Sequence, residues 1–423
     1  MAKIASVTAR QLIDCKCRPM VEVDVLTDNG FLGRGSAPTG SSVGHYEAAV
    51  VRDGNPAEYD GMSVHKAVDN VKNIIGPALV GLDIHDQQAI DRRMLELDGT
   101  PNKGRLGGNA IYSASIAAIR AAAATRGIPV YQLLAGGTVK TVPIPSFNIV
   151  NGGTYGDVTL AFNEFLVVPY RAETIYEAVE IGTKCLTALG KVLRRFLKAE
   201  PAVGRSYGWA APSDDPDVVL GLMREMVEEA GFGDKVAFAI DGAMSEMYDA
   251  QTGRYLLRGK RITGDELIDY VKILSEKYPL VFAEDILDEN DWEHYANAVA
   301  RIPKTLILGD DLTVTNMERI KRANEAGAIQ GFILKPNQVG TVTEALEAHR
   351  YASEHGLLSI PSGRAGGVID DIVMDFSVGL GVPFQKNGAP RSGERIDKLN
   401  FLMRACDTNP GCGLSRIENL IKF

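Results

Sequence analysis

The stretch GFILKPNQVG, residues 331–340, contains a short apolar run that ends in a lysine. The run FIL is typical of a buried β-strand, and Pro336 ends it because proline has no backbone N–H to donate. Lys335 therefore lies at the carboxyl end of a strand, where burying an ammonium without a partner is costly. The rest of the sequence should supply that partner.

Three earlier apolar runs end in a carboxylic acid at the matching place. KVAFAID ends at Asp241, LVFAED carries Glu284, and LILGD ends at Asp310. Helical patterns separate these runs, as in strand–helix–strand units around a parallel sheet. We therefore predict an α/β protein with a (β/α)8 barrel, whose charged strand ends meet at one mouth, the active face of such barrels.

Three carboxylates at one mouth would repel one another unless a cation lay between them. Each acid alone could instead be the N-cap of the following helix, but their matching positions favour a metal site. Ligands that offer only oxygen indicate Mg²⁺ rather than Zn²⁺. Bound cations would shift Lys335 toward its neutral form, so that it could act as a base.

The chain before the barrel has a different pattern. Residues 4–35 alternate apolar and polar side chains around an Asp-Asn-Gly turn, which predicts a β-hairpin or a short antiparallel sheet. Residues 36–44, SAPTGSSVG, are either a plain connector or a mobile lid. Residues 107–127 predict a helix with small side chains, ended by Gly127.

The glycine pair at 136–137 is the expected domain boundary. It divides the chain into a smaller N-terminal α+β capping domain, residues 1–137, and the barrel, residues 138–423.

Composition excludes some classes of partner. The net charge is −9, and no basic cluster has interleaved aromatic residues, which argues against nucleic-acid binding. No apolar stretch approaches the roughly 20 residues of a membrane span, and the first residues lack a signal-peptide core. Five cysteines without a Cys-x-x-Cys pair fit a reduced protein. We therefore expect a cytoplasmic protein with a small-molecule substrate.

The chain resembles enolase nearly from end to end. The motifs that carry the resemblance are NIVNGG (148–153), NEF (163–165), DGAMSEMY (241–248), YPLVFAEDILDENDW (278–292), GDDLTVTN (309–316), LKPNQVGT (334–341) and KNGAPRSGER (386–395). The resemblance implies an enolase-type barrel with a capping domain, two Mg²⁺ ions and a homodimer or a multiple of dimers. Enolase-superfamily sites combine a lysine or histidine base with one or two Mg²⁺ ions that stabilise the enolate.

The resemblance also implies roles for single residues. Asp241, Glu284 and Asp310 would hold the Mg²⁺ that binds the substrate carboxylate. Lys335 would be the base and Lys386 would stabilise the enolate. Ser42, in the stretch 36–44, would reach the second Mg²⁺ when the lid closes.

The residues expected around the leaving hydroxide differ from the family pattern. Enolases have a glutamate in a GDEGG loop, whereas this chain reads GRSYGWAAP, and Tyr207 stands nearest that glutamate. Tyr155 replaces a loop histidine. Asn163 replaces the glutamine of the QEF motif, whose glutamate is kept as Glu164. We expect Glu164 and Tyr207 to be catalytic, and Tyr155 and Asn163 to contact the substrate.

The segment that binds phosphate and hydroxyl groups differs too. Its family form, SHRSG, reads SGRAG here, which keeps Ser362 and Arg364 but places Gly363 and Ala365 at the other two positions. Ser362, Gly363 and Arg364 are therefore candidate substrate contacts, in a space larger than in enolase.

Three functions follow from this mixture. The leading hypothesis is a Mg²⁺-dependent enzyme that stabilises the enolate of a small phosphorylated or phosphonylated carboxylate. Its most specific form resembles carboxyphosphonoenolpyruvate synthase of phosphinate natural-product biosynthesis, a transferase with a cytidylyl-phosphonate donor. The alternatives are enolase itself, a lyase that converts 2-phosphoglycerate to phosphoenolpyruvate in glycolysis, and a non-catalytic enolase paralogue that acts as a binding protein.

Overall fold

The computed structural model describes residues 2–40, 44–153 and 162–423. The N-terminal part is built on an antiparallel sheet of β1 (Ile4–Ile13), β2 (Pro19–Thr27) and β3 (Leu32–Ser36), in that order. β2 and β3 are joined at Gly30, whose φ of +88° glycine adopts without strain. The hairpin predicted from the sequence is confirmed.

Helix α4 (Gly108–Arg126) packs closely against this sheet. A Cβ on Gly33 would lie 2.1 Å from the carbonyl oxygen of Ala117, and one on Gly35 would lie 2.1 Å from that of Ser113. Two glycines in β3 thus let the small-residue helix approach, and the predicted helix is confirmed. The other helices of this part are α1 (His65–Asn70), α2 (Gly76–Leu79), α3 (Gln87–Asp98) and α5 (Val130–Ala135).

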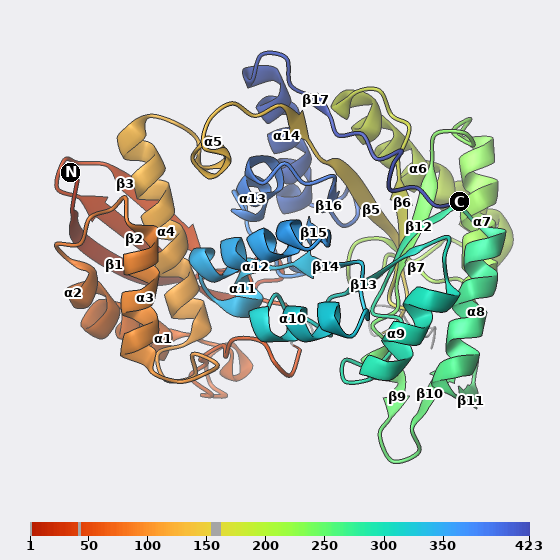
Figure 1. Ribbon diagram of the computed structural model, residues 1–423, viewed down its shortest axis with the longest axis horizontal. Helices are drawn as coiled ribbons and strands as arrows, with labels where there is room; N and C mark the ends of the chain where they lie inside the picture. Colours follow the sequence, from red (N-terminus) through yellow and green to blue (C-terminus); the bar gives the residue numbers. More distant parts are fainter. Residues whose placement is uncertain (1, 41–43, 154–161) are drawn as a thin grey trace.

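The larger part of the chain is a barrel, on the right of Figure 1. In the described residues, the order of its strands is β15 (Leu358–Pro361), β14 (Gly331–Leu334), β13 (Leu306–Gly309), β12 (Leu280–Glu284), β8 (Ala237–Asp241), β6 (Glu164–Val168), β5 (Ile144–Asn151) and β16 (Phe384–Lys386). A parallel bridge between Ser362 and Lys386 joins the two ends of this order and closes the ring. The predicted α/β barrel with a smaller N-terminal α+β part is confirmed.

Helices follow the barrel strands along the chain. They are α6 (Ile175–Leu197), α7 (Pro216–Glu229), α8 (Gly264–Lys277), α9 (Trp292–Arg301), α10 (Met317–Glu325), α11 (Pro336–Val339), α12 (Val342–Glu354), α13 (Val373–Gly379) and α14 (Gly393–Thr408). Short strands complete the fold: β4 (Thr141–Val142), β7 (Trp209–Ala210), β9 (Tyr248–Asp249), β10 (Arg254–Leu257), β11 (Lys260–Ile262) and β17 (Gly413–Leu414). Within the described ranges, no helix is both long enough and apolar enough to span a membrane.

One strand departs from the all-parallel sheet that the sequence pattern predicts. β6 runs antiparallel to both of its neighbours, β5 and β8. Its first residue, Glu164, therefore pairs with the last residue of β8, Asp241. An antiparallel strand thus delivers its N-terminal residue to the same mouth that the parallel strands reach with their C-terminal residues.

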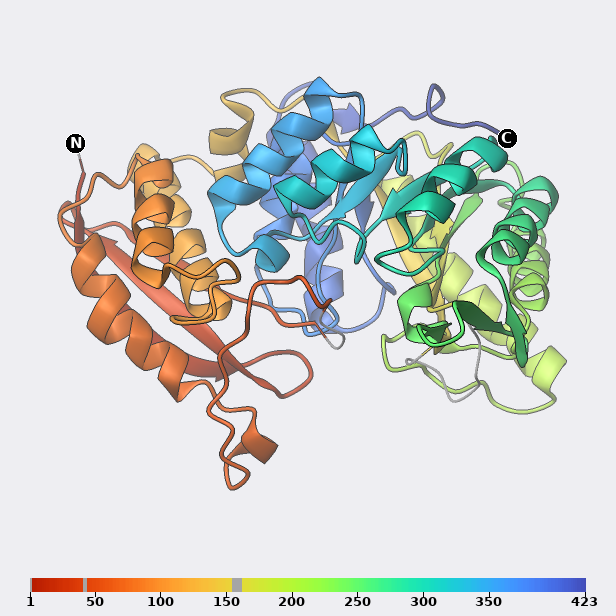
Figure 2. The same ribbon diagram turned by 60° about the horizontal axis from the view of Figure 1, so that its bottom comes forward.

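The segment after β3 joins the two parts of the molecule. Figure 2 shows it running from the N-terminal sheet toward the barrel. Thr39 forms an antiparallel bridge with Gly366, and the Ala48 N–H donates to the carbonyl of Gln338 at 2.7 Å. Both contacts are to barrel residues, so the described ends of this segment are anchored on the barrel.

Candidate active site

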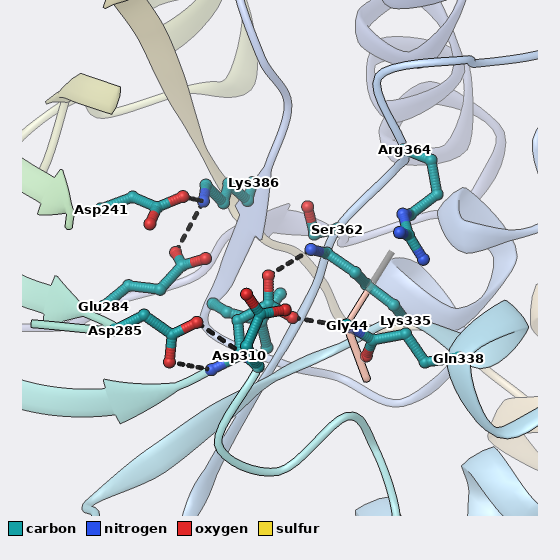
Figure 3. A network of polar contacts seen from close by, with 12 residues as sticks. Gly44, Asp241, Glu284, Asp285, Asp310, Lys335, Gln338, Ser362, Arg364 and Lys386 are labelled. Carbon is teal, nitrogen blue, oxygen red and sulfur yellow. Dashed lines mark hydrogen bonds and ion pairs between the residues drawn. The ribbon is translucent and has the colours of Figure 1, made fainter. Parts of the chain in front are cut away.

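A buried lysine joins three carboxylates at the mouth of the barrel. Lys386 ends β16, and its Nζ lies 2.6 Å from Glu284, 2.9 Å from Asp241 and 3.1 Å from Glu164. Figure 3 shows its nitrogen between Asp241 and Glu284. Burial works to lower the pKa of Lys386, but the carboxylates, Asp241 first, outweigh it and raise the pKa. The ammonium is therefore the form that this cluster stabilises.

Lys335 has its ion-pair partner at the end of the neighbouring strand. Lys335 follows β14, and its Nζ contacts a carboxylate oxygen of Asp310, which follows β13. Gln338 Nε2 donates to the other oxygen of Asp310 at 2.9 Å. Burial acts to lower the pKa of Lys335, but Asp310 raises it above its ordinary value. Lys335 was expected from the sequence to become neutral, and this would require bound cations that offset the effect of Asp310 on its pKa.

Asp285 positions the loop that carries Asp310. Its carboxylate accepts the backbone N–H of Asp310 at 2.8 Å and that of Asp311 at 2.7 Å, and the Tyr295 hydroxyl donates to it at 3.2 Å. Burial and then the charge of Asp310 raise the pKa of Asp285 to about 7. The sequence analysis did not single out Asp285, although it follows Glu284 directly and shares its position at a strand end.

The residues of the mouth fit divalent cations. Six carboxylates gather near the Lys335 and Lys386 ammonium groups, namely Glu164, Asp241, Glu284, Asp285, Asp310 and Asp311, while Arg364, Arg395 and Lys398 line the same pocket. Burial and then the charge of Asp241 raise the pKa of Glu284, and its Oε1 is buried without a hydrogen-bond partner among the described residues. Lys386 contacts the other oxygen of Glu284, so Oε1 is the atom that a metal ion would take, and an all-oxygen donor set suits Mg²⁺.

The tightest cluster of carboxylates at the mouth shares Asp310 with the ligand set predicted from the sequence. At this mouth, the carboxylate oxygens within 4.8 Å of one another belong to Asp285, Asp310 and Asp311; the other group of this kind in the described part of the chain, Asp53, Glu58 and His65, does not line the pocket. The expected set was Asp241, Glu284 and Asp310. The two sets differ because the Lys386 ammonium lies between Asp241 and Glu284, and because Asp285 binds the backbone of the Asp310 loop. The assignment of Asp241, Glu284 and Asp310 as metal ligands stays a prediction.

Most of the predicted site residues line one pocket. The lining includes candidates for catalysis, for substrate binding and for metal binding: Asn163, Glu164, Asp241, Asp310, Lys335, Ser362, Gly363, Arg364 and Lys386. Asn163 donates its backbone N–H to the Asp241 carbonyl at 2.9 Å, and its Oδ1 is buried with no hydrogen-bond partner in the described part of the chain. Ser42 and Tyr155 lie outside the described residues.

Tyr207 is not among the residues that line this pocket, and the catalytic role expected for it from the sequence stays a prediction. Its backbone adopts a φ of +66°, and its hydroxyl donates to the Cys15 carbonyl at 3.4 Å. It lines a separate hollow with Cys15 and Glu394, whereas its neighbour Ser206 lines the central pocket. The loop that replaces the expected GDEGG therefore presents a serine to the pocket, and the tyrosine faces elsewhere.

Arg364 is held by a residue that the sequence analysis missed. Its guanidinium donates to both carboxylate oxygens of Glu47, at 2.8 and 3.0 Å, and both side chains are buried. Glu47 Oε1 also accepts the Gly44 N–H at 2.9 Å. The segment after β3 thus contributes the charge that balances Arg364, and the pairing appears only once the two parts of the chain pack together.

Two further cations line the pocket, Arg395 and Lys398 of α14. Arg395 donates to the carbonyl and the hydroxyl of Ser206, at 2.6 and 3.1 Å. The sequence signal for this pair was the KNGAPRSGER motif, which includes Arg395 and stops three residues before Lys398.

Comparison with known proteins agrees with this geometry. The family model "Enolase, N-terminal domain" matches residues 4–134, and "Enolase, C-terminal TIM barrel domain" matches residues 139–409. A protein named "Enolase" from Methanopyrus kandleri is 42% identical over 408 residues, which cover 96% of this chain and 95% of that protein. These matches extend over both parts of the fold and over the whole pocket.

Proposed function

Because this chain belongs to the enolase family, a family of Mg²⁺-dependent hydro-lyases, we propose that it interconverts 2-phosphoglycerate and phosphoenolpyruvate. The observation that carries the proposal is a pair of lysines, the half-buried Lys335 and the buried Lys386, each in contact with carboxylates at the strand ends. Abstraction of a proton next to a carboxylate needs a base on one side and positive charge on the other, and this pair can supply both.

Two side chains would transfer protons, and a third would stabilise the enolate between the two transfers. Lys335, once neutral, takes the proton from C2 of 2-phosphoglycerate, and the electron pair moves into the carboxylate as an enolate. Lys386 donates hydrogen bonds to the enolate oxygen. Glu164 in its protonated form then gives a proton to the hydroxyl at C3, which leaves as water while the C2–C3 double bond forms.

Enolases use Mg²⁺, typically two ions per active site, and the pocket's carboxylates would hold them. When bound, the ions bind the substrate's anionic groups and stabilise the negative charge of the enolate. Asp241, Glu284 and Asp310 are the proposed ligands, with Ser42 proposed for the second ion. The positive charge of the two Mg²⁺ ions would also lower the pKa of Lys335, so that it could act as a base.

Glu164 is the proposed acid because of where β6 places it. It lines the pocket and contacts Lys386 at 3.1 Å, and it is no part of the Asp241, Glu284 and Asp310 set. Since Tyr207 lies outside the pocket, Glu164 is the carboxyl on which proton donation to the leaving group depends. General-acid help of this kind contributes about 10²–10⁴-fold in rate.

The comparisons give no support to the more specific transferase hypothesis. The curated relative is named enolase, and nothing in the matches points to carboxyphosphonoenolpyruvate synthase or to a cytidylyl-phosphonate donor. The same membership favours an enzyme over a binding protein. The homodimer, the cytoplasmic location and the domain limits 1–137 and 138–423 stay predictions.

A direct assay tests the proposal. The purified protein is mixed with 2-phosphoglycerate and Mg²⁺, and phosphoenolpyruvate is followed by the ultraviolet absorbance of its double bond. We expect turnover that requires Mg²⁺ and is lost in Lys335→Ala. Absence of turnover in the Mg²⁺-loaded, folded protein, at all substrate concentrations, would overturn the proposed reaction.

A further inference from the structure

Gly363 and Lys398 share one small space at the edge of the pocket. Gly363 follows β15, Lys398 lies in α14, and both line the pocket. A Cβ added to Gly363 would lie 2.2 Å from Lys398 Nζ, so the ammonium can hold its position only because residue 363 has no side chain. Enolases are expected to carry a histidine here, and its replacement opens the space that the ammonium fills.

Lys398 is buried with an incomplete set of partners. It is 3% exposed, and its Nζ lies 3.4 Å from Asp371 Oδ2, which is itself buried and has no hydrogen-bond partner among the described residues. Within the described ranges, the Lys398 ammonium makes this one ion pair and no hydrogen bond. An ammonium has three N–H donors, and a buried charge with unused donors is costly unless a ligand takes them up.

The other cations on this side of the pocket are already engaged. Arg364 is paired with both oxygens of Glu47, and Arg395 donates twice to Ser206. Among these three cations, Lys398 is the one whose polar contact with the described residues is a single ion pair at 3.4 Å, whereas each guanidinium makes two hydrogen bonds. Its neighbours in the SGRAG segment, Gly363 and Ala365, add no polar side chain that could compete for the N–H donors of Lys398.

We propose that Lys398 binds the phosphorus oxyanion of the substrate, in the place where the family has a histidine. This inference rests on the proposed function, and it names the group that recognises the phosphoryl end of the same substrate. An ammonium is a compact point charge with rotatable donors, so it suits a tetrahedral oxyanion, and its hydrogen bonds to one are charge-assisted. The swap at residue 363 would then exchange one phosphate contact for another.

The test compares Lys398→Met with Gly363→Ala and with the double variant. A methyl group at residue 363 forces the flexible end of Lys398 aside, so Gly363→Ala should act through the ammonium although it leaves the lysine in place. Titration calorimetry with Mg²⁺ measures the binding of phosphoenolpyruvate and of inorganic phosphate. Loss of a charged hydrogen bond predicts weakening of about 10–100-fold for Lys398→Met. The double variant should bind no more weakly than Lys398→Met alone.

Lys103→Met is the matched control. Lys103 is also a buried lysine with an ion pair, to Glu344 at 3.0 Å, but it lies outside this pocket. It should lower the melting temperature without weakening phosphate binding. In turnover, Lys398→Met should raise KM more than it lowers kcat, because the contact exists before and after proton transfer.

Two outcomes would overturn the inference: unchanged phosphate affinity in folded Lys398→Met, or a Gly363→Ala effect that adds fully to that of Lys398→Met. The proposed reaction fails separately. Binding of phosphate that depends on Lys398 without any turnover would contradict the dehydration alone, whereas turnover indifferent to Lys398 would contradict the oxyanion contact alone.

Discussion

Glu164 is the cross-strand partner of Asp241, although the two residues lie at opposite ends of their strands. Glu164 begins β6 and Asp241 ends β8, and the antiparallel pairing sets them side by side at the mouth. Both contact the Lys386 ammonium, at 3.1 and 2.9 Å. One reversed strand thus places the proposed proton donor, Glu164, beside a proposed metal ligand, Asp241.

Lys386→Met should destabilise the metal-free protein. The substitution leaves the buried Asp241 and Glu284 and the half-buried Glu164 without their shared cation. Removing one partner of a buried ion pair costs about 3–5 kcal/mol. Chemical denaturation in a chelator should show that loss, and added Mg²⁺ should recover part of it. Equal stability of the variant and the natural protein in chelator would contradict the role of Lys386.

Asp241→Asn should weaken Mg²⁺ binding by at least about tenfold while the barrel stays folded, since the substitution removes one ligand charge and keeps the shape. Titration calorimetry with Mg²⁺ measures the effect. Asp217→Asn is the control, because Asp217 pairs with Lys277 at the protein surface. The same Mg²⁺ affinity in both variants would show that Asp241 is no ligand.

Tyr207→Phe should keep kcat within about twofold of the natural protein. The phenol hydroxyl donates to the Cys15 carbonyl and does not line the central pocket, and a single neutral hydrogen bond is worth about 1 kcal/mol to stability. Steady-state kinetics with 2-phosphoglycerate check this. A fall in kcat of a hundredfold would return Tyr207 to the role that the sequence first suggested.

Asp375 should make stability depend on pH. Burial raises the pKa of its carboxyl to about 7, above the ordinary value of 3.8, so folding favours the protonated form. The stability that this group contributes is complete below its ordinary pKa and is lost as pH rises toward and through about 7. Asp375→Asn removes the titration and can still accept the Tyr131 N–H.

Denaturant unfolding of Asp375→Asn at several pH values between 5 and 8 measures this dependence. The gain of the variant over the natural protein should grow as pH rises. Asp69→Asn, at an exposed position, should show no such trend. A stability difference that stays constant across the range would mean that Asp375 does not titrate there.

Local sequence patterns were enough to find the strand ends that carry Asp241, Glu284, Asp310 and Lys335, because burial and chain termination act on neighbouring residues. The direction of β6 could not be found this way, since NEFLVV has the same apolar pattern in a parallel or an antiparallel strand. The residues that depend on packing between distant segments were also missed.

Three contacts illustrate that limit. Glu47 reaches Arg364 across 317 residues, and Gly363 accommodates Lys398 only in the folded barrel. Tyr207 aligned with a catalytic position by its place in the loop, but its φ of +66° and the Cys15 carbonyl direct it away from the pocket. The candidate roles followed from residue type, whereas the side-chain directions required the tertiary structure.

The most direct test of the central claim, that Lys335 moves the C2 proton and Glu164 protonates the leaving hydroxide, is proton NMR of 2-phosphoglycerate with the Mg²⁺-loaded protein in D₂O. The C2 proton and the vinyl protons of phosphoenolpyruvate are followed together. We predict that the natural protein exchanges the C2 proton for solvent deuterium faster than the vinyl protons of phosphoenolpyruvate appear. Glu164→Gln should keep the exchange and lose about 10²–10⁴-fold in vinyl formation, and Lys335→Ala should lose both. Vinyl protons that form as fast in Glu164→Gln as in the natural protein, or C2 exchange that persists in Lys335→Ala, would contradict the central claim.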